Sequence, residues 1–306
     1  MMAPRRLLVT GHEGQVVRAL REKVKERHDL ELVTIGRPQF DLAFADRAAI
    51  LRHLHNTSPD LVISAAAFTA VDQAEAMPDV TFRVNRDAPT ILAAEAHRLA
   101  LPIIHLSTDY VFNGTKQGLY TEDDEPEPLN IYGMSKLAGE EGVRAVNPDH
   151  VILRTSWLYG PSGTNFVRTM LRLAATRPVI DVVCDQQGSP TSTLDLADAI
   201  LAVAERLLAR PDADFRGTFH IAGPGQTTWA EFARAIFSHS RGHGGPGAEV
   251  RDIAAAVYKA RALRPANSRL DCRKLARVYG LTLPSWQDSL DPVVTAILAE
   301  TDKAAR

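Results

Sequence analysis

The stretch Arg6–Val17, RLLVTGHEGQVV, decides the fold that we expect for this chain. It opens with a short apolar run that stops at Gly11, which predicts a buried strand. Helical spacing of apolar residues begins at Gly14 and continues to Glu26. Two glycines three residues apart, between a strand and a helix, suit a pyrophosphate resting on the helix N-terminus. An ordinary tight turn would use the same two glycines, so the rest of the chain must decide between the two readings.

Strand and helix patterns alternate through the first half of the chain. The expected strands are residues 6–10, 30–35, 60–66, 102–107 and 151–156, and the expected helices are 14–26, 46–56, 74–99 and 132–145. We expect the helix at 74–99 in two pieces, interrupted near Pro78 and Pro89. The alternation predicts an α/β fold, a Rossmann-like doubly wound parallel sheet with right-handed crossovers. Ligands bind outside the carboxyl ends of such strands.

The second half of the chain is less regular. A polar, acidic segment at 109–130 is expected to be a covering loop, and residues 241–247 a surface loop. Further elements are expected as helices at 165–175, 194–208, 229–240, 270–279 and 290–300, and strands at 179–184 and 218–222, the last returning to the main sheet. We therefore expect a nucleotide-binding domain of residues 1–157, with a returning segment near 190–222. Residues 158–189 and 223–306 would form a smaller α/β lobe for the substrate.

Composition narrows the class of protein. The chain has 306 residues, 45% apolar and 24% charged, with a net charge of −2. That balance gives no electrostatic case for binding nucleic acid or an anionic membrane. Cys184 and Cys272 have no metal-ligand spacing and are expected to be free thiols, and we expect no metal site. The N-terminus lacks the pattern of a signal peptide and no apolar run could span a bilayer, so a cytoplasmic protein is the default expectation.

The residues after the strands are candidates for the site. Arg37 follows the second strand, where an arginine favours the 2′-phosphate of NADP over the ribose hydroxyls of NAD, although it could also be a solvated surface residue. Asp41, shortly beyond, could approach the adenine. Small residues at 65–67 let a ligand approach the backbone or simply pack against a helix. Thr108 could hold a carbonyl oxygen or only cap a turn. Trp157 could stack on a ring or be a core residue.

Tyr132 and Lys136 lie four residues apart in a predicted helix, so they share one helix face. An ammonium near a phenol favours the ionised phenol, so we expect the pKa of Tyr132 to lie below its usual value of about 10. Such a pair can exchange a proton with a sugar oxygen. Taken alone the pair is a weak motif. It faces the same crevice as Thr108 and the other strand ends, and this co-location favours one shared site over a chance pairing of the two residues.

Several motifs give the chain a family resemblance. It resembles the extended short-chain dehydrogenase/reductases and, within them, the dTDP-4-dehydrorhamnose reductase family, over nearly its whole length. Motifs specific to that family are STDYVF at 107–112, DQQGSPT at 185–191 and RPANSRL at 264–270. The others are GHEGQV at 11–16, AAAFTAVD at 65–72, LNIYGMSKLAGE at 129–140, RTSWLY at 154–159, FHIAG at 219–223 and TTW at 227–229.

The resemblance implies a reaction and roles for named residues. The reaction would be the NADPH-dependent reduction of the C4 keto group of dTDP-4-dehydro-L-rhamnose to dTDP-L-rhamnose, with NADH as a second possible cofactor. Tyr132 would donate the proton, Lys136 would bind the nicotinamide ribose and Thr108 would polarise the keto group. The cofactor would contact Gly11, Gly14, Gln15, Val16, Arg37, Asp41, Leu42, Ala65, Ala66, Ala67, Phe68, Thr69, Leu106, Tyr132 and Lys136. The substrate would contact Thr108, Asp109, Trp157, Asn267, Ser268 and Arg269.

Two positions depart from the family pattern. Val17 stands where many relatives carry glycine, which questions how closely the first helix approaches the sheet. Phe68 stands where relatives often have a polar residue, so one cofactor or substrate contact would differ. The expected partner is a small nucleotide sugar, with the chain a monomer or a homodimer.

Other functions compete with this reading. Sequences that resemble nucleotide-sugar dehydratases carry Thr-Asp-Glu after the fourth strand, whereas this chain has Tyr110 in place of the Glu. An epimerase would keep NAD tightly bound. A reductase of a related 4-keto sugar would differ only in pocket shape. A non-catalytic regulatory subunit, a different class of protein, would not need Tyr132, Lys136 and Thr108 together.

Overall fold

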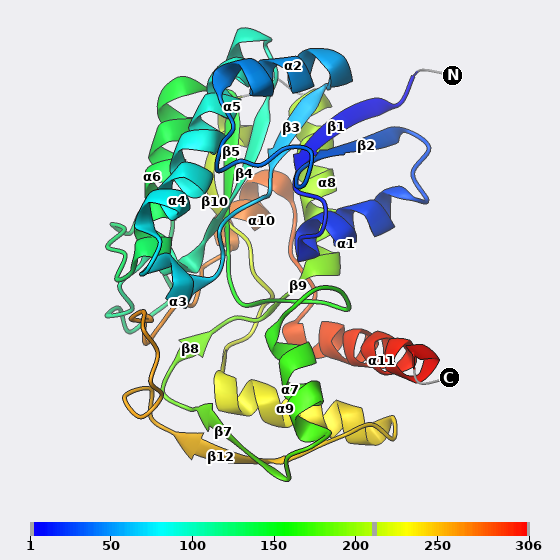
Figure 1. Ribbon diagram of the computed structural model, residues 1–306, viewed down its shortest axis with the longest axis vertical. Coiled ribbons are helices and arrows are strands. Elements are labelled where there is room, and N and C mark those ends of the chain that lie inside the picture. The colour runs from blue at the N-terminus through cyan, green and yellow to red at the C-terminus, as the bar shows by residue number, and fades with distance from the viewer. Residues whose placement is uncertain (1–2, 210–212, 305–306) are drawn as a thin grey trace.

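The apolar runs of the first half form one parallel sheet. The computed structural model describes residues 3–209 and 213–304. Six strands pair in the order β10-β5-β4-β3-β1-β2, all parallel (Figure 1). Their bounds are β1 Arg5–Thr10, β2 Leu30–Ile35, β3 Leu61–Ser64, β4 Ile103–Thr108, β5 His150–Thr155 and β10 Gly217–His220. The doubly wound parallel sheet is confirmed, and the expected return of a late strand is found at its edge beside β5.

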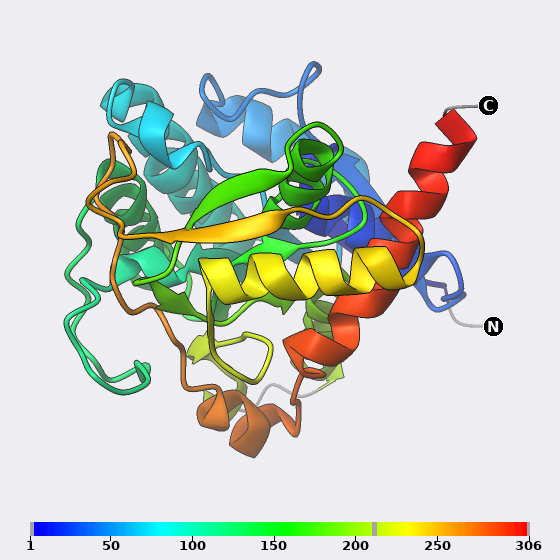
Figure 2. The ribbon, with the colours of Figure 1, turned by 90° about the horizontal axis from the view of Figure 1, so that it is seen from below.

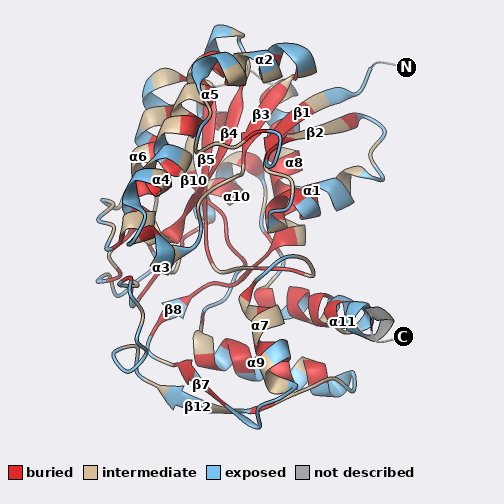
Figure 3. Cartoon of the chain, in the orientation of Figure 1, coloured by how far each residue is buried: buried red, intermediate tan, exposed pale blue. Residues whose placement is uncertain are grey.

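Helices cover both faces of this sheet (Figure 3). On one face, α1 Gln15–Val24 and α8 Thr193–Ala209 pack against each other and against a core that includes Leu7, Leu153 and Phe219. On the other face, α2 Arg47–Thr57, α5 Ala88–Arg98 and α6 Ile131–Val146 pack on a core that includes Leu8 and Ile103. Successive side chains of a strand point to opposite faces, so neighbouring Leu7 and Leu8 enter different cores.

The segment before α5 differs from the expectation of two helical pieces. α3 Val71–Ala74 is short, Pro78 begins α4 Pro78–Phe82, and a π-helical turn at Arg83–Asp87 leads directly into α5. Pro89 therefore causes no break in the helical path. Proline is tolerated in the first turn of a helix, where its missing N–H is not needed. The α-helix is interrupted just before Pro89, as expected, but by a π-helical turn and not by an end of the helical path.

The second half builds a separate apolar cluster below the sheet. Strand β7 Val179–Val183 pairs in parallel with β12 Glu249–Ile253, and α9 Trp229–Gly242 runs along them (Figure 2). The cluster also receives α7 Phe166–Ala174 and α11 Trp286–Ala304. Strand β12 was not expected from the sequence. Its side chains are mostly exposed, so the apolar alternation that reveals a strand is missing.

Short elements join the two cores. Two-residue strands pair as β6 with β9 and β8 with β11, and α10 packs by the sheet edge at β10. Their bounds are β6 Leu158–Tyr159, β8 Gln187–Gly188, β9 Thr191–Ser192, β11 Thr227–Thr228, α10 Arg273–Tyr279, and the 3-10 turns Asp109–Val111 and Ala213–Phe215. Both cysteines are free, as expected. Within the described residues, no helix is long and apolar enough to cross a membrane.

Candidate functional site

The loop after β1 is shaped for a phosphate group. Gly11 has a φ of 103°, a left-handed conformation that favours glycine. Gly14 is the N-cap of α1 and supplies no capping side chain, so the first amides of the helix point to the carboxyl edge of the sheet without a side-chain acceptor. A helix N-terminus of this kind favours an anion. Val17 is buried, and its Cγ2 would lie 3.3 Å from a Cβ added at Gly11, so the helix packs closely despite the departure from glycine.

Gln15 makes a contact that the sequence did not reveal. Its Oε1 accepts from Asn165 Nδ2 at 3.0 Å, across 150 positions of sequence. Asn165 is buried, caps α7 by accepting from Arg168 N, and donates to Gly160 O at 2.9 Å. The segment 160–165 is thereby fixed against the loop after β1. Only the Asn165 N-cap pattern could have drawn attention to this residue in the sequence.

The loop after β2 carries Arg37 exposed, without a hydrogen-bond or ion-pair partner in residues 3–209 and 213–304. An uncommitted guanidinium at this position can bind a phosphate. Asp41 instead accepts from Ala43 N at 2.9 Å, and Leu42 packs on the core beneath α2. Asp41 and Leu42 therefore form a compact turn beside Arg37.

The segment after β3 is held from both sides. Thr10 Oγ1 accepts from Ala65 N and Ala66 N, each at 3.0 Å, which ties this segment to the end of β1. Asn85, from the π-helical turn, accepts from Phe68 N at 2.7 Å and donates to Ser135 Oγ on α6 at 2.9 Å. Backbone atoms make the Phe68 contact, so the unusual side chain does not alter it. Ala67 and Thr69 lie in the same fixed segment.

Thr108, Tyr132 and Asp109 come together at the end of β4. The Thr108 side chain lies close enough to Tyr132 to lower the pKa of that phenol, and Thr108 Oγ1 donates to Asp109 Oδ1 at 2.9 Å. The Ser268 side chain, from the second half of the chain, lies close enough to Asp109 to lower the pKa of its carboxyl. Asp109 Oδ2 is buried without a hydrogen-bond partner among the described residues. A buried carboxyl oxygen of this kind is costly unless a ligand hydroxyl or a proton satisfies it.

Ionisation of these groups follows from burial. Burial raises the pKa of Asp109 to about 7, against the opposing hydrogen bonds from Ser268 and Thr108. Burial also raises the pKa of Tyr132 to about 12, although its bond to Thr108 lowers it in part. The expected lowering of the Tyr132 pKa by Lys136 is therefore wrong for this structure. Desolvation disfavours the phenolate, and the Lys136 ammonium is engaged elsewhere.

Lys136 lies one turn after Tyr132 and is buried. Its Nζ donates to Leu106 O at 2.5 Å and lies 3.2 Å from His105 Nε2. Burial lowers the pKa of Lys136 to about 8, while the nearby Glu140 opposes that shift.

The Asn130 side chain caps the helix by accepting from Gly133 N at 2.8 Å and donates to Leu263 O at 2.7 Å. The helix that carries the tyrosine is thus tied to the second half of the chain.

Trp157 lies between the sheet and a large cleft. It has a φ of 45°, and its ring stacks on Trp229 with 3.5 Å between centroids. Trp229 and Phe166 contribute to the wall of a cleft of about 1000 Å³ between α7, the β7–β12 pair and the segment 255–264. The cleft is lined by apolar and aromatic residues together with the polar side chains of Thr169, Arg177, Asp181, Gln186, Arg251 and Arg264. Its size suits a nucleotide-sized ligand.

The three residues expected at the nucleotide end have different surroundings. Asn267 Nδ2 donates to Lys116 O and Gly118 O, at 2.6 and 2.8 Å. Arg269 Nε donates to Asn267 Oδ1 at 2.8 Å, and its NH2 group to Gln117 O. These two side chains therefore fasten the acidic loop to the segment 264–270. Of the three, only Ser268 reaches the Thr108–Asp109 group.

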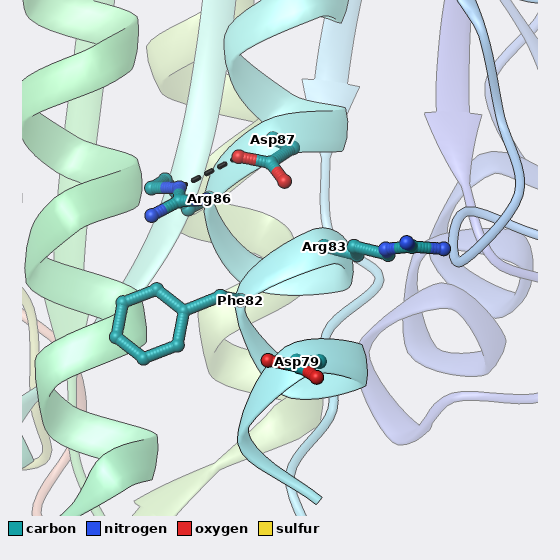
Figure 4. A pocket seen from close by; sticks show the side chains of 5 residues that line it. All are labelled: Asp79, Phe82, Arg83, Arg86 and Asp87. Carbon is teal, nitrogen blue, oxygen red and sulfur yellow. Dashed lines mark hydrogen bonds and ion pairs between the residues drawn. The ribbon is translucent and has the colours of Figure 1, made fainter.

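A second hollow lies away from this site. It is about 290 Å³ and is formed by one helical stretch, with Arg86 Nε donating to Asp87 Oδ1 at 2.6 Å (Figure 4). Asp79, Phe82 and Arg83 complete it. None of its residues belongs to the strand ends that carry the Thr108–Tyr132–Lys136 group. Among the residues that the structure describes, no group of three or more His, Cys, Asp or Glu could hold a metal ion.

The donor set at the carboxyl edge fits a dinucleotide phosphate. The glycine-lined N-terminus of α1 suits the pyrophosphate, exposed Arg37 suits a 2′-phosphate, and Lys136 offers an ammonium to a ribose. The small side chains at 65–67 leave room for a flat ring along the backbone. These features together fit NADPH.

Comparisons with known proteins agree with this geometry. The family model "RmlD substrate binding domain" matches residues 5–299. A protein of Sinorhizobium fredii named dTDP-4-dehydrorhamnose reductase is 48% identical over 295 residues, which are 96% of this chain and 98% of that protein. A crystal structure of a dTDP-4-dehydrorhamnose reductase from Clostridium acetobutylicum has a TM-score of 0.88 and 34% identity, covering 96% of this chain and 99% of its own.

A further solved structure carries a cofactor. The dTDP-4-dehydrorhamnose reductase of Bacillus anthracis, solved in complex with NADP, has a TM-score of 0.87 and 33% identity. The match covers 95% of this chain and 98% of that one. Family model, relatives and solved structures each span almost the full length of this chain. The chain belongs to the RmlD family, the family of the dTDP-4-dehydrorhamnose reductases.

Proposed function

We propose that this chain reduces the C4 keto group of dTDP-4-dehydro-L-rhamnose to give dTDP-L-rhamnose, with NADPH as reductant. The observation that carries the proposal is that Thr108, at the end of β4, lies beside Tyr132 of α6, with Lys136 one turn later on the same helix. Names of full-length relatives support the substrate. When bound, the reduced nicotinamide supplies the hydride.

Tyr132 acts as the proton donor. With a pKa of about 12 it is protonated throughout the neutral range, as a donor must be. A keto oxygen that gains negative charge becomes a stronger base than the phenolate and takes the proton. Thr108 turns its one hydroxyl proton from Asp109 Oδ1 to that oxygen, and the Lys136 ammonium binds the ribose of the cofactor. Asp109, with its unpartnered Oδ2, binds a sugar hydroxyl.

The residue after Asp109 favours reduction over dehydration. Tyr110 stands where a dehydratase would need its second carboxylate, and its ring meets Tyr132 edge-on with 5.9 Å between centroids. No second carboxylate side chain is present at this position to complete an elimination pair. We therefore propose reduction and not loss of water as the reaction of this site.

The cofactor and the nucleotide sugar bind to different lobes of the chain. Residues 1–157, with a returning segment near 190–222, hold the cofactor, and residues 158–189 and 223–306 hold the nucleotide sugar. Separate apolar cores beneath the sheet helices and around α9 support this division. Hydrogen exchange tests it: NADPH should protect amides at the ends of β1, β2 and β3 and leave those of α9 unchanged. Protection centred on α9 would refute the division.

Replacement of Tyr132 by phenylalanine tests the proton donor. We expect kcat to fall by about 10²- to 10⁴-fold, the usual worth of a general acid, with the Kd of NADPH almost unchanged. Tyr279→Phe is the matched control, since its buried hydroxyl donates to Phe215 O in the sheet core away from the site. Turnover at the wild-type rate in Tyr132→Phe would refute the role of this residue.

A further inference from the structure

A buried histidine of the central sheet contacts Lys136. His105 lies on β4 and is 1% exposed, and its Nε2 is 3.2 Å from Lys136 Nζ. On the other side of the ring, Nδ1 is 3.1 Å from Ser64 Oγ on the neighbouring strand β3. Ser64 and His105 are direct partners in the register of the two strands. The sheet itself therefore sets the distance between this pair and the helix that carries Lys136.

The chemistry of the three groups fixes the form of the imidazole. A lysine ammonium has donors and no acceptor, so His105 Nε2 must be the acceptor in this contact. The ring proton then sits on Nδ1 and is donated to Ser64 Oγ. Burial and the charge of Lys136 hold the pKa of His105 well below its usual value, with His150 contributing in the same direction. A neutral ring with this tautomer satisfies all three groups.

We propose that His105, fixed by Ser64, is a positioning residue that holds the Lys136 ammonium charged and oriented through a neutral imidazole acceptor. With Leu106 O it provides two acceptors for three ammonium protons. The third proton remains for the ribose of the cofactor. This role rests on the proposed function, because it assigns to His105 an effect on the reaction only through Lys136.

Other charges around Lys136 do not replace this acceptor. Glu140, one turn later on α6, is committed to a buried ion pair with Arg154 of β5 at 2.7 Å. Arg144 approaches the same carboxylate at 3.8 Å. Glu75, directly after α3, accepts from Ile131 N at the start of α6. On the substrate side the titratable neighbours are Tyr132 and Asp109; Asp109 accepts from Thr108, and Thr108 also lies beside Tyr132.

Substitution of His105 by leucine tests the proposal without substrate. Titration of protein labelled with ¹³C at lysine Cε should show Lys136, identified by its absence in Lys136→Met, titrating near the pKa of about 8. In His105→Leu the titration should move down by about one pH unit, the usual worth of a hydrogen bond to a charged group. In His105→Gln, whose amide oxygen can occupy the place of Nε2, it should move back toward the wild-type value.

His220→Leu is the matched control. His220 is also fully buried on a strand of the same sheet, with Nδ1 3.1 Å from Tyr120 O and no contact to Lys136. It should leave the Lys136 titration unchanged even if it lowers stability. Nitrogen NMR of the wild-type histidines should show His105 neutral with its proton on Nδ1 from pH 6 to 8.

The outcomes separate this proposal from the proposed function. An unchanged Lys136 titration in His105→Leu, or a His105 ring that is charged at pH 6, would overturn the positioning role whatever the enzyme activity. If the lysine titration shifts as expected but no 4-keto sugar is reduced, the contact stands and the proposed function fails. In active enzyme, the basic limb of kcat/KM should shift by the same amount as the lysine titration, and an unshifted limb would also refute the role.

Discussion

The ring of Trp157 lies flat on the ring of Trp229, with 3.5 Å between centroids and 6° between planes. The first indole follows β5 and the second begins α9, so this stack joins the sheet to the cleft wall. Gly188 lies beneath it, and a Cβ added there would be 2.2 Å from Trp157 Cε2. Only glycine leaves room for the indole in this position.

Gly188→Ala should therefore displace Trp157. We expect KM for the nucleotide sugar to rise about tenfold, the order of the energy of an aromatic contact, while the Kd of NADPH stays within about twofold. Gly242→Ala is the control, because no atom lies within 4 Å of its added Cβ. Steady-state kinetics and NADPH fluorescence measure both constants. Equal effects of the two alanines would contradict a substrate role for the stack.

The ion pair of Arg264 with Asp72 should fix the position of the segment 261–264, which forms part of the cleft wall. Arg264 Nη2 donates to Asp72 Oδ2 at 2.7 Å, and the backbone N atoms of Arg261 and Ala262 donate to Asp72 Oδ1. Arg264 also lies close enough to Tyr110 to lower the pKa of that phenol, and the ring of Tyr110 meets that of Tyr132 edge-on. Arg264→Met should raise KM about tenfold, equivalent to about 1.4 kcal/mol, and should also lower kcat.

Arg251→Met provides the comparison for that variant. Arg251 lines the same cleft but forms an exposed ion pair with Asp181 on β7. Exposed pairs contribute little, so its effect on KM should stay within about threefold. Kinetics with the nucleotide sugar, at fixed saturating NADPH, measure both variants. A larger loss in Arg251→Met than in Arg264→Met would contradict the role of the Asp72 contact.

The free energy of unfolding should decrease as pH rises because of Asp109. Burial raises its folded pKa from 3.8 to about 7, so the folded chain binds more protons than the unfolded chain between these values. The contribution of Asp109 to the free energy of unfolding is therefore largest at low pH and is lost as pH rises through about 7. Asp109→Asn should flatten this dependence, as measured by urea unfolding at pH 5, 6, 7 and 8.

The exposed Asp79 offers a control for that titration. Asp79→Asn should keep the wild-type slope of unfolding free energy against pH. An Asp109→Asn variant with the same slope as the wild type would show that the buried carboxyl does not titrate as described.

Arg37 should set the preference between the two nicotinamide cofactors. It is exposed beside the end of β2 and has no partner within the described part of the chain. Arg37→Asp replaces a phosphate ligand by a like charge, so the Kd of NADPH should rise about tenfold or more while that of NADH does not. Arg52→Asp, an exposed arginine on α2, should change neither constant. Parallel weakening of both cofactors by Arg37→Asp would exclude a contact to the 2′-phosphate.

Local sequence patterns were enough to predict the main sheet. The apolar runs at β1, β3, β4 and β5 are buried on both faces, so they stand out without knowledge of their neighbours. The nearness of Thr108 to the helix that carries Tyr132 and Lys136 was also predictable, since strand ends and one helix turn suffice to bring them to one edge of the sheet.

Contacts between distant segments were not predictable in this way. The bond between Gln15 and Asn165 spans 150 positions, and the link from Asn130 to Leu263 spans 133. Strand β12 has a mostly exposed pattern that gives no period, and only its pairing with β7 defines it. The pKa of Tyr132 depends on how deeply the phenol is buried, which one helix turn does not reveal.

Reduction of one sugar nucleotide by the wild-type chain tests the central claim most directly. The measurement is NADPH oxidation in the presence of dTDP-4-dehydro-L-rhamnose, followed by NMR of the product, with Tyr132→Phe assayed in parallel. We predict stoichiometric oxidation of NADPH, dTDP-L-rhamnose as the product, and a loss of about 10²-fold or more in the variant. Absence of NADPH oxidation, or a product with the opposite configuration at C4, would contradict the account.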